Sequence, residues 1–240
     1  MSSAAAASDY SPEGKRKRSL NMEPVSEAQQ VGTQSMILNA SVLNSNHPDL
    51  ETEKNAVQLT LDPNTAHRKL SLSEGNRRVI WGNEQPYPDH PERFNTYHQL
   101  LCREGLSEHC YWEQEWSVEG EAEKRWGGAW MGAAYKAIIR KGGAISEGKL
   151  GYNDKSWSLH CSKAKHSAWH KENSTAVPAP PSPSHRVGVY LDWPAGTLSF
   201  YSVSSDTRTL LHTFHTTFTE PLYPGFRVDW DSSVSLCMLG

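Results

Sequence analysis

From residue 57 onward, apolar and polar side chains alternate in short runs that are separated by turn residues. Residues 57–61 and 70–73 place apolar side chains at every second position, which is the period of a strand with one buried face. Proline, glycine and asparagine, which favour tight turns, follow these runs at residues 62–64 and 74–76. A further short run covers residues 79–81. This part of the chain therefore predicts three short strands.

The clearest hairpin signal lies further along the chain. Residues 186–192 alternate apolar and polar side chains, residues 194–196 supply a turn with proline and glycine, and residues 197–201 alternate back. Residues 150–152 and 156–159 are two more strand-like segments on either side of a short turn. Strands therefore continue to the C-terminal part of the chain.

Two long segments lack this alternation. Residues 81–94 are rich in proline and aromatic side chains, and residues 172–184 are rich in proline and serine, so we expect no regular structure in either. Helical periodicity is weak throughout residues 55–240. Short strands with turn residues at about every 8 to 12 positions are typical of an all-β domain, an antiparallel two-sheet sandwich.

Residues 1–50 have a different composition, rich in Ser, Ala, Asn, Glu and Gln, with Tyr10 as the single aromatic residue. Such a segment buries too little apolar surface to offset its ordering entropy, so we expect a disordered tail. A short helix over residues 23–31 would be marginal in isolation. One basic cluster fits either a nuclear localisation signal or a solvated group of charges. The cluster consists of Lys15, Arg16, Lys17 and Arg18.

Composition narrows the function classes. The chain has 240 residues, of which 37% are hydrophobic and 21% charged, with a formal net charge of -3. This balance offers no strongly basic surface to a phosphate backbone, so no nucleic-acid partner is expected. The chain holds no apolar run of about 18 residues that could span a membrane, and its start lacks the pattern of a signal peptide. We therefore expect a cytoplasmic protein, with the nucleus as an alternative.

The sequence gives only weak evidence for a catalytic site. Ser199 with Asp192 and either His185 or His212 would supply the side chains of a hydrolase triad. The sequence has no G-x-S-x-G elbow, and Ser199 falls in the middle of a hairpin strand, where a nucleophile would be poorly exposed. We therefore expect no enzyme activity and no cofactor.

Metal and disulfide sites are not expected either. The cysteines form no C-x-x-C pair, so they are predicted to be free, partly buried thiols. Adjacent histidine and cysteine residues at 109–110 and 160–161 would face opposite sides of a strand and could not both bind one ion easily. The cysteines are Cys102, Cys110, Cys161 and Cys237.

Five motifs follow one another along the C-terminal three quarters of the chain. They are LTLDPNTA followed by LSLS within residues 59–73, YWEQEW at 111–116, GYNDKSWSL at 151–159, VGVYLDWPAGTLSFY at 187–201 and PLYPGF at 221–226. In this order they resemble the PRY-SPRY (B30.2-type) domain family, most of all the modules of fish tripartite-motif, NLR-type and stonustoxin-like proteins. The resemblance covers nearly all of the chain from residue 57, with a PRY part at about 57–109 and a SPRY part at about 110–240.

The resemblance implies both a fold and a function. The family fold is a bent antiparallel two-sheet sandwich of the concanavalin-like jelly-roll type. The family function is recognition of a partner protein, usually in innate-immune or ubiquitin-ligase-related signalling. An alternative is a sensor of phosphorylated metabolites, as in butyrophilin-like members. Pore formation, by comparison with the toxin relatives, rests on fold analogy alone.

The chain departs from the usual family context. It contains no RING, B-box, long heptad segment or P-loop, which suggests a stand-alone adaptor or a truncated product. Residues 118–130 look longer and more charged than the usual turn of the family. Residues 130–134 alter a strand that is hydrophobic in the family, and this alteration argues against the phosphometabolite alternative.

Partner contacts are expected on loops, because rigid scaffolds present binding residues there. By position, the variable loops of the family correspond to residues 81–94, 135–147 and 162–169. Trp, Tyr and Arg most often supply interface hot spots, and a basic loop suits an acidic or phosphorylated partner. The candidate contacts are Trp81, Tyr87, His90, Arg93, Tyr135, Lys136, Arg140, Lys141, His166 and Trp169. The side chains expected in the core are Trp112, Trp157, Leu191, Leu198 and Phe200.

Overall fold

The computed structural model describes residues 49–119, 128–144, 146–180, 184–205 and 207–239. Regular structure within these residues is almost entirely β. The elements are α2 (Asp49–Lys54), β1 (Leu70–Ser73), β2 (Arg78–Trp81), β3 (Gln99–Leu101), β4 (His109–Val118), β5 (Ala129–Tyr135), β6 (Ser156–Cys161), β7 (His166–His170), β8 (Asn173–Val177), β9 (Arg186–Asp192), β10 (Thr197–Val203), β11 (Arg208–His215), β12 (Leu222–Val228) and β13 (Ser232–Leu236).

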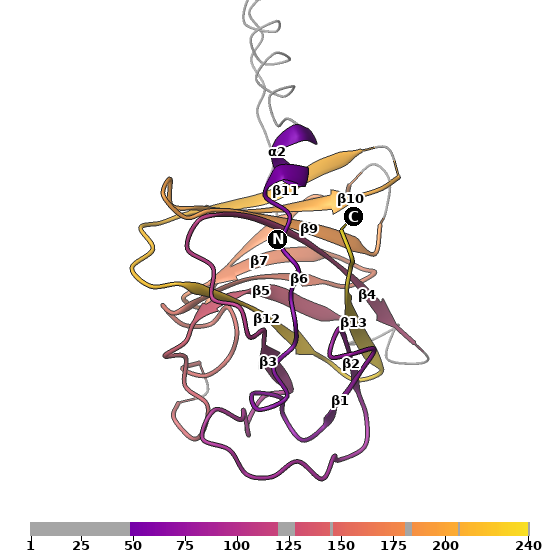
Figure 1. The fold of residues 1–240 in the computed structure, drawn as a ribbon, viewed down its shortest axis with the longest axis vertical. Coiled ribbons are helices and arrows are strands. Elements are labelled where there is room, and N and C mark those ends of the chain that lie inside the picture. Colours follow the sequence, from indigo (N-terminus) through magenta and orange to yellow (C-terminus); the bar gives the residue numbers. More distant parts are fainter. Residues whose placement is uncertain (1–48, 120–127, 145, 181–183, 206, 240) are drawn as a thin grey trace, which may run out of the picture. The chain divides into compact units, whose positions relative to one another are not determined.

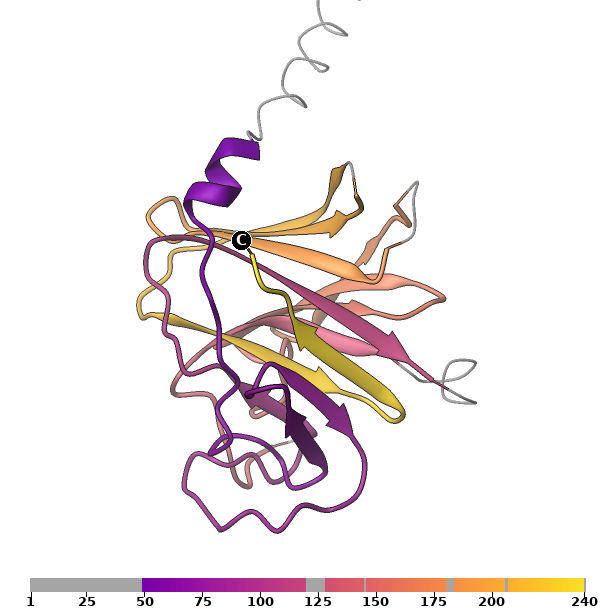
Figure 2. The same ribbon diagram turned by 45° about the vertical axis from the view of Figure 1, so that its right-hand side comes forward.

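The strands form two antiparallel sheets that face one another across the core (Figure 1 and Figure 2). One sheet has seven strands in the order β1-β2-β13-β4-β9-β10-β11, and the other has six in the order β3-β12-β5-β6-β7-β8. Inward-facing side chains of both sheets, such as Trp112 and Met131, fill one hydrophobic core. The predicted two-sheet sandwich is confirmed. The five side chains expected in the core, Trp112, Trp157, Leu191, Leu198 and Phe200, are all buried.

The strand predicted at residues 57–61 is wrong. The segment joins the sheets only through two isolated bridges, Ala56 with Tyr111 and Leu61 with Cys102. Tyr111 belongs to β4 of the seven-stranded sheet, whereas Cys102 follows β3 of the six-stranded sheet. The segment therefore passes from one sheet to the other, and it alternates because one side faces the core, without pairing along its length.

Two other local predictions need correction. Residues 150–152 form a turn rather than a strand, with Gly151 at a positive φ of 84°. Residues 172–184 were expected to lack regular structure, yet they contain β8. This strand lies at the edge of its sheet and pairs with β7 through backbone groups. Its side chains are mostly exposed, so no apolar alternation marks it. The irregular segment expected at residues 81–94 begins one residue later, since Trp81 ends β2 and residues 82–94 contain neither helix nor strand.

Some predictions fall outside the described residues. These are the basic cluster at residues 15–18, the possible helix at 23–31 and most of the long segment at 118–130. The short helix α2 was not predicted by periodicity. Among the residues that the structure describes, no helix has the length and apolar character needed to cross a membrane.

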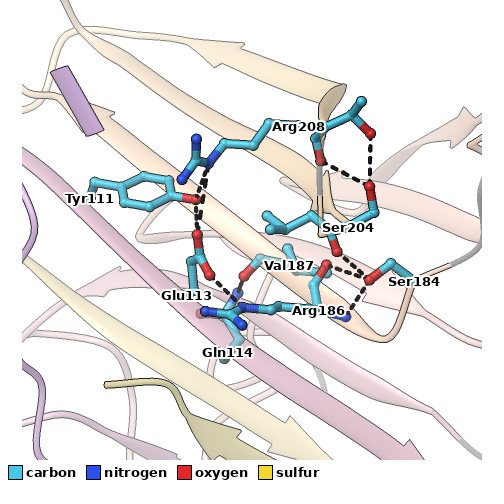
Figure 3. Close-up of polar contacts among 10 residues, drawn as sticks. Tyr111, Glu113, Gln114, Ser184, Arg186, Val187, Ser204 and Arg208 are labelled. Carbon is cyan, nitrogen blue, oxygen red and sulfur yellow. Dashed lines mark hydrogen bonds and ion pairs between the residues drawn. The ribbon is translucent and has the colours of Figure 1, made fainter. Parts of the chain in front are cut away.

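A buried carboxylate links three strands on the outer face of the seven-stranded sheet (Figure 3). Glu113 of β4 is only 2% exposed, and it accepts hydrogen bonds from the hydroxyl of Tyr111 and from Nε of Arg186 on β9. Nε of Arg208 on β11 donates to the Tyr111 hydroxyl at 3.1 Å and lies 3.8 Å from the Glu113 carboxylate. Burial, and then the neighbouring Glu113, raise the pKa of Tyr111, so its hydroxyl stays protonated as a donor.

Candidate functional site

A hollow of about 850 Å³ opens on the outer face of the six-stranded sheet, and we call it the aromatic groove. Its floor comes from outward-facing positions of β5, β6, β7 and β12. Its walls come from the segment before β3, the turn before β6 and the residues that follow β12. The lining residues are Thr96, Tyr97, His98, Trp130, Lys149, Tyr152, His160, Ser162, Ala164, Lys165, Ser167, Trp169, Arg227, Asp229 and Trp230.

Strand β5 is buried on both faces, and this places a tryptophan in the floor. Met131 and Ala133 face the core between the sheets. Because neighbouring side chains of a strand point to opposite faces, Trp130 and Ala134 face the other side, where a second apolar cluster forms. The indole of Trp130 stacks on the imidazole of His160 of β6, with 4.5 Å between the ring centroids.

The turn before β6 completes the aromatic wall. Gly151 has a φ of +84°, and a Cβ at this position would lie only 2.1 Å from the hydroxyl of Ser158. A glycine therefore lets the turn lie directly against the sheet. This contact brings the ring of Tyr152 onto the indole of Trp169, with 4.7 Å between the centroids. Both rings also lie within 6 Å of Trp130, at 5.7 and 5.5 Å.

The groove carries a net positive charge. Among the described residues that line it, Asp229 is the only carboxylate, and it is held by Nη2 of Arg227 at 2.9 Å and by Nε1 of Trp130 at 3.2 Å. Nζ of Lys149 lies over the Tyr152 ring, 3.3 Å from its centroid. In the part of the chain that the structure describes, neither Lys149 nor Lys165 forms an ion pair. The charged residues of the groove are thus Lys149, Lys165, Arg227 and Asp229.

The groove keeps this charge at neutral pH. Burial, and then the neighbouring Arg227, lower the pKa of Lys149 to about 8, so the ammonium form still predominates at pH 7. Burial raises the pKa of Asp229, while Arg227 and Trp130 oppose that rise. Burial, and then the charge of Arg227, lower the pKa of His160 to about 4, so its imidazole is neutral. Three cations therefore face one carboxylate.

An exposed tryptophan marks the rim of the groove. Trp230 is 59% exposed, unusual for a large apolar side chain. Its indole lies 6.3 Å from that of Trp81, which donates from Nε1 to Nδ1 of His98 at 3.2 Å. Two predicted contacts, Trp169 in the floor and Trp81 behind the rim, therefore belong to this area.

The predicted basic loop lies elsewhere, and its two lysines are already paired with carboxylates. Lys136 lies 3.2 Å from the carboxylate of Glu92, and Lys141 lies 2.7 Å from that of Asp89. The guanidinium of Arg140 lies 4.4 Å from the ring centroid of Phe94 and donates to the carbonyl of Glu92. These contacts join the loop after β5 to the loop after β2. They leave less charge for a partner than the sequence suggests.

Other predicted contacts hold the fold together. Arg93 is 3% exposed and donates to three backbone carbonyl groups. Tyr135 is buried, and its hydroxyl accepts a hydrogen bond from the backbone N–H of Thr219. The hydroxyl of half-buried Tyr87 donates to the carbonyl of Leu70. Arg93 and Tyr135 therefore face the protein interior.

The two candidate histidines lie in different surroundings. Nδ1 of His90 accepts a hydrogen bond from the backbone N–H of Glu92 at 3.2 Å. His166 belongs to β7 rather than to a loop, and its ring lies 6.4 Å from that of Trp116. Within the described ranges, no cluster of three or more His, Cys, Asp or Glu side chains could hold a metal ion. Cys161 is fully buried in the core while the adjacent His160 lines the groove, so the two point to opposite faces as predicted.

Most residues that line the groove were not predicted as contacts, among them Trp130, Lys149, Tyr152, Arg227 and Trp230. Trp130 and Arg227 lie on strands, whereas contacts were expected on loops. The sequence feature that could identify them is a large aromatic or charged side chain at an outward position of a strand that is otherwise apolar. Tyr152 lies in residues 150–152, which were expected to form a strand, and Lys149 directly precedes them. The sequence around Trp230 gives no indication of a binding role beyond its position just after a strand.

Comparison with known proteins identifies relatives of two kinds. The SPRY domain model matches residues 109–240, and the model of PRY, the SPRY-associated domain, matches residues 59–106. Stonustoxin subunit beta of Synanceia horrida is 45% identical over 172 residues, which cover 71% of this chain and 23% of the toxin subunit. Tripartite motif-containing protein 16 of Mus musculus is 41% identical over 175 residues, which cover 71% of this chain and 29% of that protein. The chain thus spans about a quarter of the length of these relatives.

Two solved structures share the fold. The stonustoxin structure has a TM-score of 0.67 and 42% identity, and the match covers 76% of this chain and 27% of the toxin chain. The TRIM65 PSpry domain has a TM-score of 0.66 and 27% identity, and the match covers 77% of this chain and 92% of that domain.

Proposed function

The chain belongs to the SPRY domain family and carries the PRY segment in front of the SPRY part; on this basis we propose that it binds a partner protein through the aromatic groove. The groove itself carries the proposal, because it combines a volume of about 850 Å³ with a wall of tryptophan and tyrosine rings. Such side chains, together with arginine, most often supply the binding energy of protein interfaces. Trp230, exposed at the rim, offers a partner apolar surface to cover.

Members of this family are typically binding modules rather than enzymes, and we propose residues 55–240 as the module. Two mouse relatives are named tripartite motif-containing proteins. Their similarity supports a role inside the cell, in innate-immune or ubiquitin-ligase-related signalling. Other relatives bear toxin names, but the matched part is about a quarter of those subunits, so we do not extend the proposal to pore formation.

A second candidate function has one observation in its favour. Lys149, Lys165 and Arg227 place three cations at the groove, as a site for a phosphorylated small molecule would require. Asp229 counts against this candidate, because its carboxylate would repel a phosphate group that carries nearly two negative charges. Calorimetry of the full chain with pyrophosphate separates the two functions. Heat of binding that is lost on replacing Lys149 would favour the small-molecule sensor.

The proposal predicts that labelling of a nearby partner protein in cells depends on Trp230. We expect a biotin ligase fused to the full chain to label a specific partner, and the variant Trp230→Ala to reduce that labelling by at least about tenfold, since a tryptophan hot spot contributes about 2 kcal/mol or more. Trp230 is exposed, so its replacement should leave the fold intact. Quantitative mass spectrometry of the labelled proteins measures the effect.

Leu210→Ala is the matched control. Leu210 is also a large exposed apolar side chain, at 51%, but it lies on β11 at the edge of the other sheet. Labelling should not change in this variant. Equal labelling by the native chain and the Trp230 variant, or a loss confined to the Leu210 variant, would place the partner away from the groove.

A further inference from the structure

We propose that the aromatic groove recognises an acidic side chain of the partner, Asp or Glu, next to an aromatic or large aliphatic side chain. This inference rests on the proposed function and names the chemistry of the partner segment. It follows from three features of the groove: its uncompensated charge, the position of Lys149 and the distribution of apolar surface.

The charge balance leaves two lysines for a partner. Asp229 is committed to Arg227 and to Trp130, one carboxylate oxygen to each. No described carboxylate pairs with Lys149 or Lys165, although both line the same hollow. An anion that enters the groove would therefore meet two ammonium groups without displacing an existing ion pair. Charge complementarity of this kind selects partners by penalising cationic ones.

Lys149 is placed where a carboxylate would gain most. Its ammonium lies against the face of Tyr152 at 3.3 Å and within 5.7 Å of the Trp130 centroid, so much of its hydration is replaced by aromatic rings. A cation in such surroundings interacts with an anion more strongly than it would in bulk water. The partial burial that lowers the pKa of Lys149 reports the same loss of hydration.

The remaining surface of the groove is apolar. Trp169 and Tyr152 stack on one side of the charged centre, and Trp230 is exposed on the rim. A side chain that neighbours the acidic residue would rest on these rings. A carboxylate carries one negative charge, whereas a phosphate monoester carries about 1.5 to 2, so the nearby Asp229 tolerates the carboxylate better. These features favour a segment of a protein partner over a free phosphate.

The test uses a phage-displayed library of random linear peptides selected on the full chain. We expect the selected sequences to be enriched in Asp or Glu adjacent to Trp, Phe, Leu or Ile. A synthetic peptide from the selection should bind about tenfold more weakly to Lys149→Met, because one charge-assisted contact is lost while the apolar stem remains. Its affinity for the native chain should also fall as salt is raised.

Two further variants complete the design. Lys149→Arg keeps the charge and should retain most of the affinity. Lys155→Met removes a lysine that pairs with Asp154 outside the groove, at 3.8 Å, and should leave the affinity unchanged.

Each outcome decides the proposal. Selected peptides that lack acidic residues, yet lose binding to Trp230→Ala, would overturn the inference while the proposed function stands. Pyrophosphate that binds and displaces the peptide at equal or lower concentration would reassign the site to phosphate. If the native chain selects no peptide that Trp230→Ala does not also select, the inference and the proposed function both fail.

Discussion

Replacement of Gly132 by alanine is expected to lower the free energy of unfolding by at least roughly 3 kcal/mol. Gly132 lies in the middle of β5 and pairs with Ser158 of β6. A Cβ at this position would lie 2.0 Å from the carbonyl oxygen of Trp157 and 2.7 Å from Cα of Ser158. Both atoms belong to the backbone of β6. The clash can be relieved only by moving β6 away from β5, which disrupts the floor of the aromatic groove.

Gly82→Ala is the control for this prediction. Gly82 follows β2, has no positive φ, and a Cβ there would meet nothing within 4 Å. This variant should stay within about 0.5 kcal/mol of the native chain. Urea unfolding followed by tryptophan fluorescence measures both variants. Similar midpoints for Gly132→Ala and the native chain would mean that the two strands are not packed as closely as described.

Replacement of Glu113 by alanine is expected to lower the free energy of unfolding by roughly 2–3 kcal/mol. Its carboxylate is almost fully buried and joins Tyr111 to two guanidinium groups (Figure 3). Without it, Arg186 and Arg208 repel one another on the same face of the sheet. Their side chains are 38% and 31% exposed, so water partly compensates, and the effect stays below that of a fully buried pair.

Glu115→Ala provides the comparison for Glu113. Glu115 lies two residues further along β4, on the same face, and its side chain is exposed. Urea unfolding should show a change below about 0.5 kcal/mol for this variant. If the two glutamates prove equally dispensable, the network in Figure 3 does not hold β4, β9 and β11 together.

Much of the fold can be predicted from the alternation of side chains and from turn residues. The hairpin of β9 and β10 is placed correctly by its turn residues, although nearly all of its side chains are buried. Strand β8 was not predicted, because an edge strand with exposed polar side chains looks like a loop. Residues 57–61 were predicted to be a strand but are not, because a segment that crosses between the sheets can also alternate.

The candidate site is harder to predict, for a physical reason. Binding residues were expected on loops, and Lys136, Arg140 and Lys141 were candidates because a basic loop suits an acidic partner. The carboxylate partners of Lys136 and Lys141 are Glu92 and Asp89, 44 and 52 residues earlier, on a loop whose approach is set by tertiary structure. The groove itself is built on the outer face of strands. Strand β5 is buried on both faces. The face of such a strand that carries a binding site depends on the segments that cover each face.

The most direct test of the central claim is hydrogen exchange of the full chain with and without the partner that proximity labelling identifies. Binding is expected to slow exchange at the segments that line the aromatic groove, residues 96–98, 149–152, 162–165 and 229–230. No change is expected in the paired loops at residues 82–94 and 136–141. Protection confined to those loops or to β11, with the groove segments unchanged, would contradict the assignment of the binding surface.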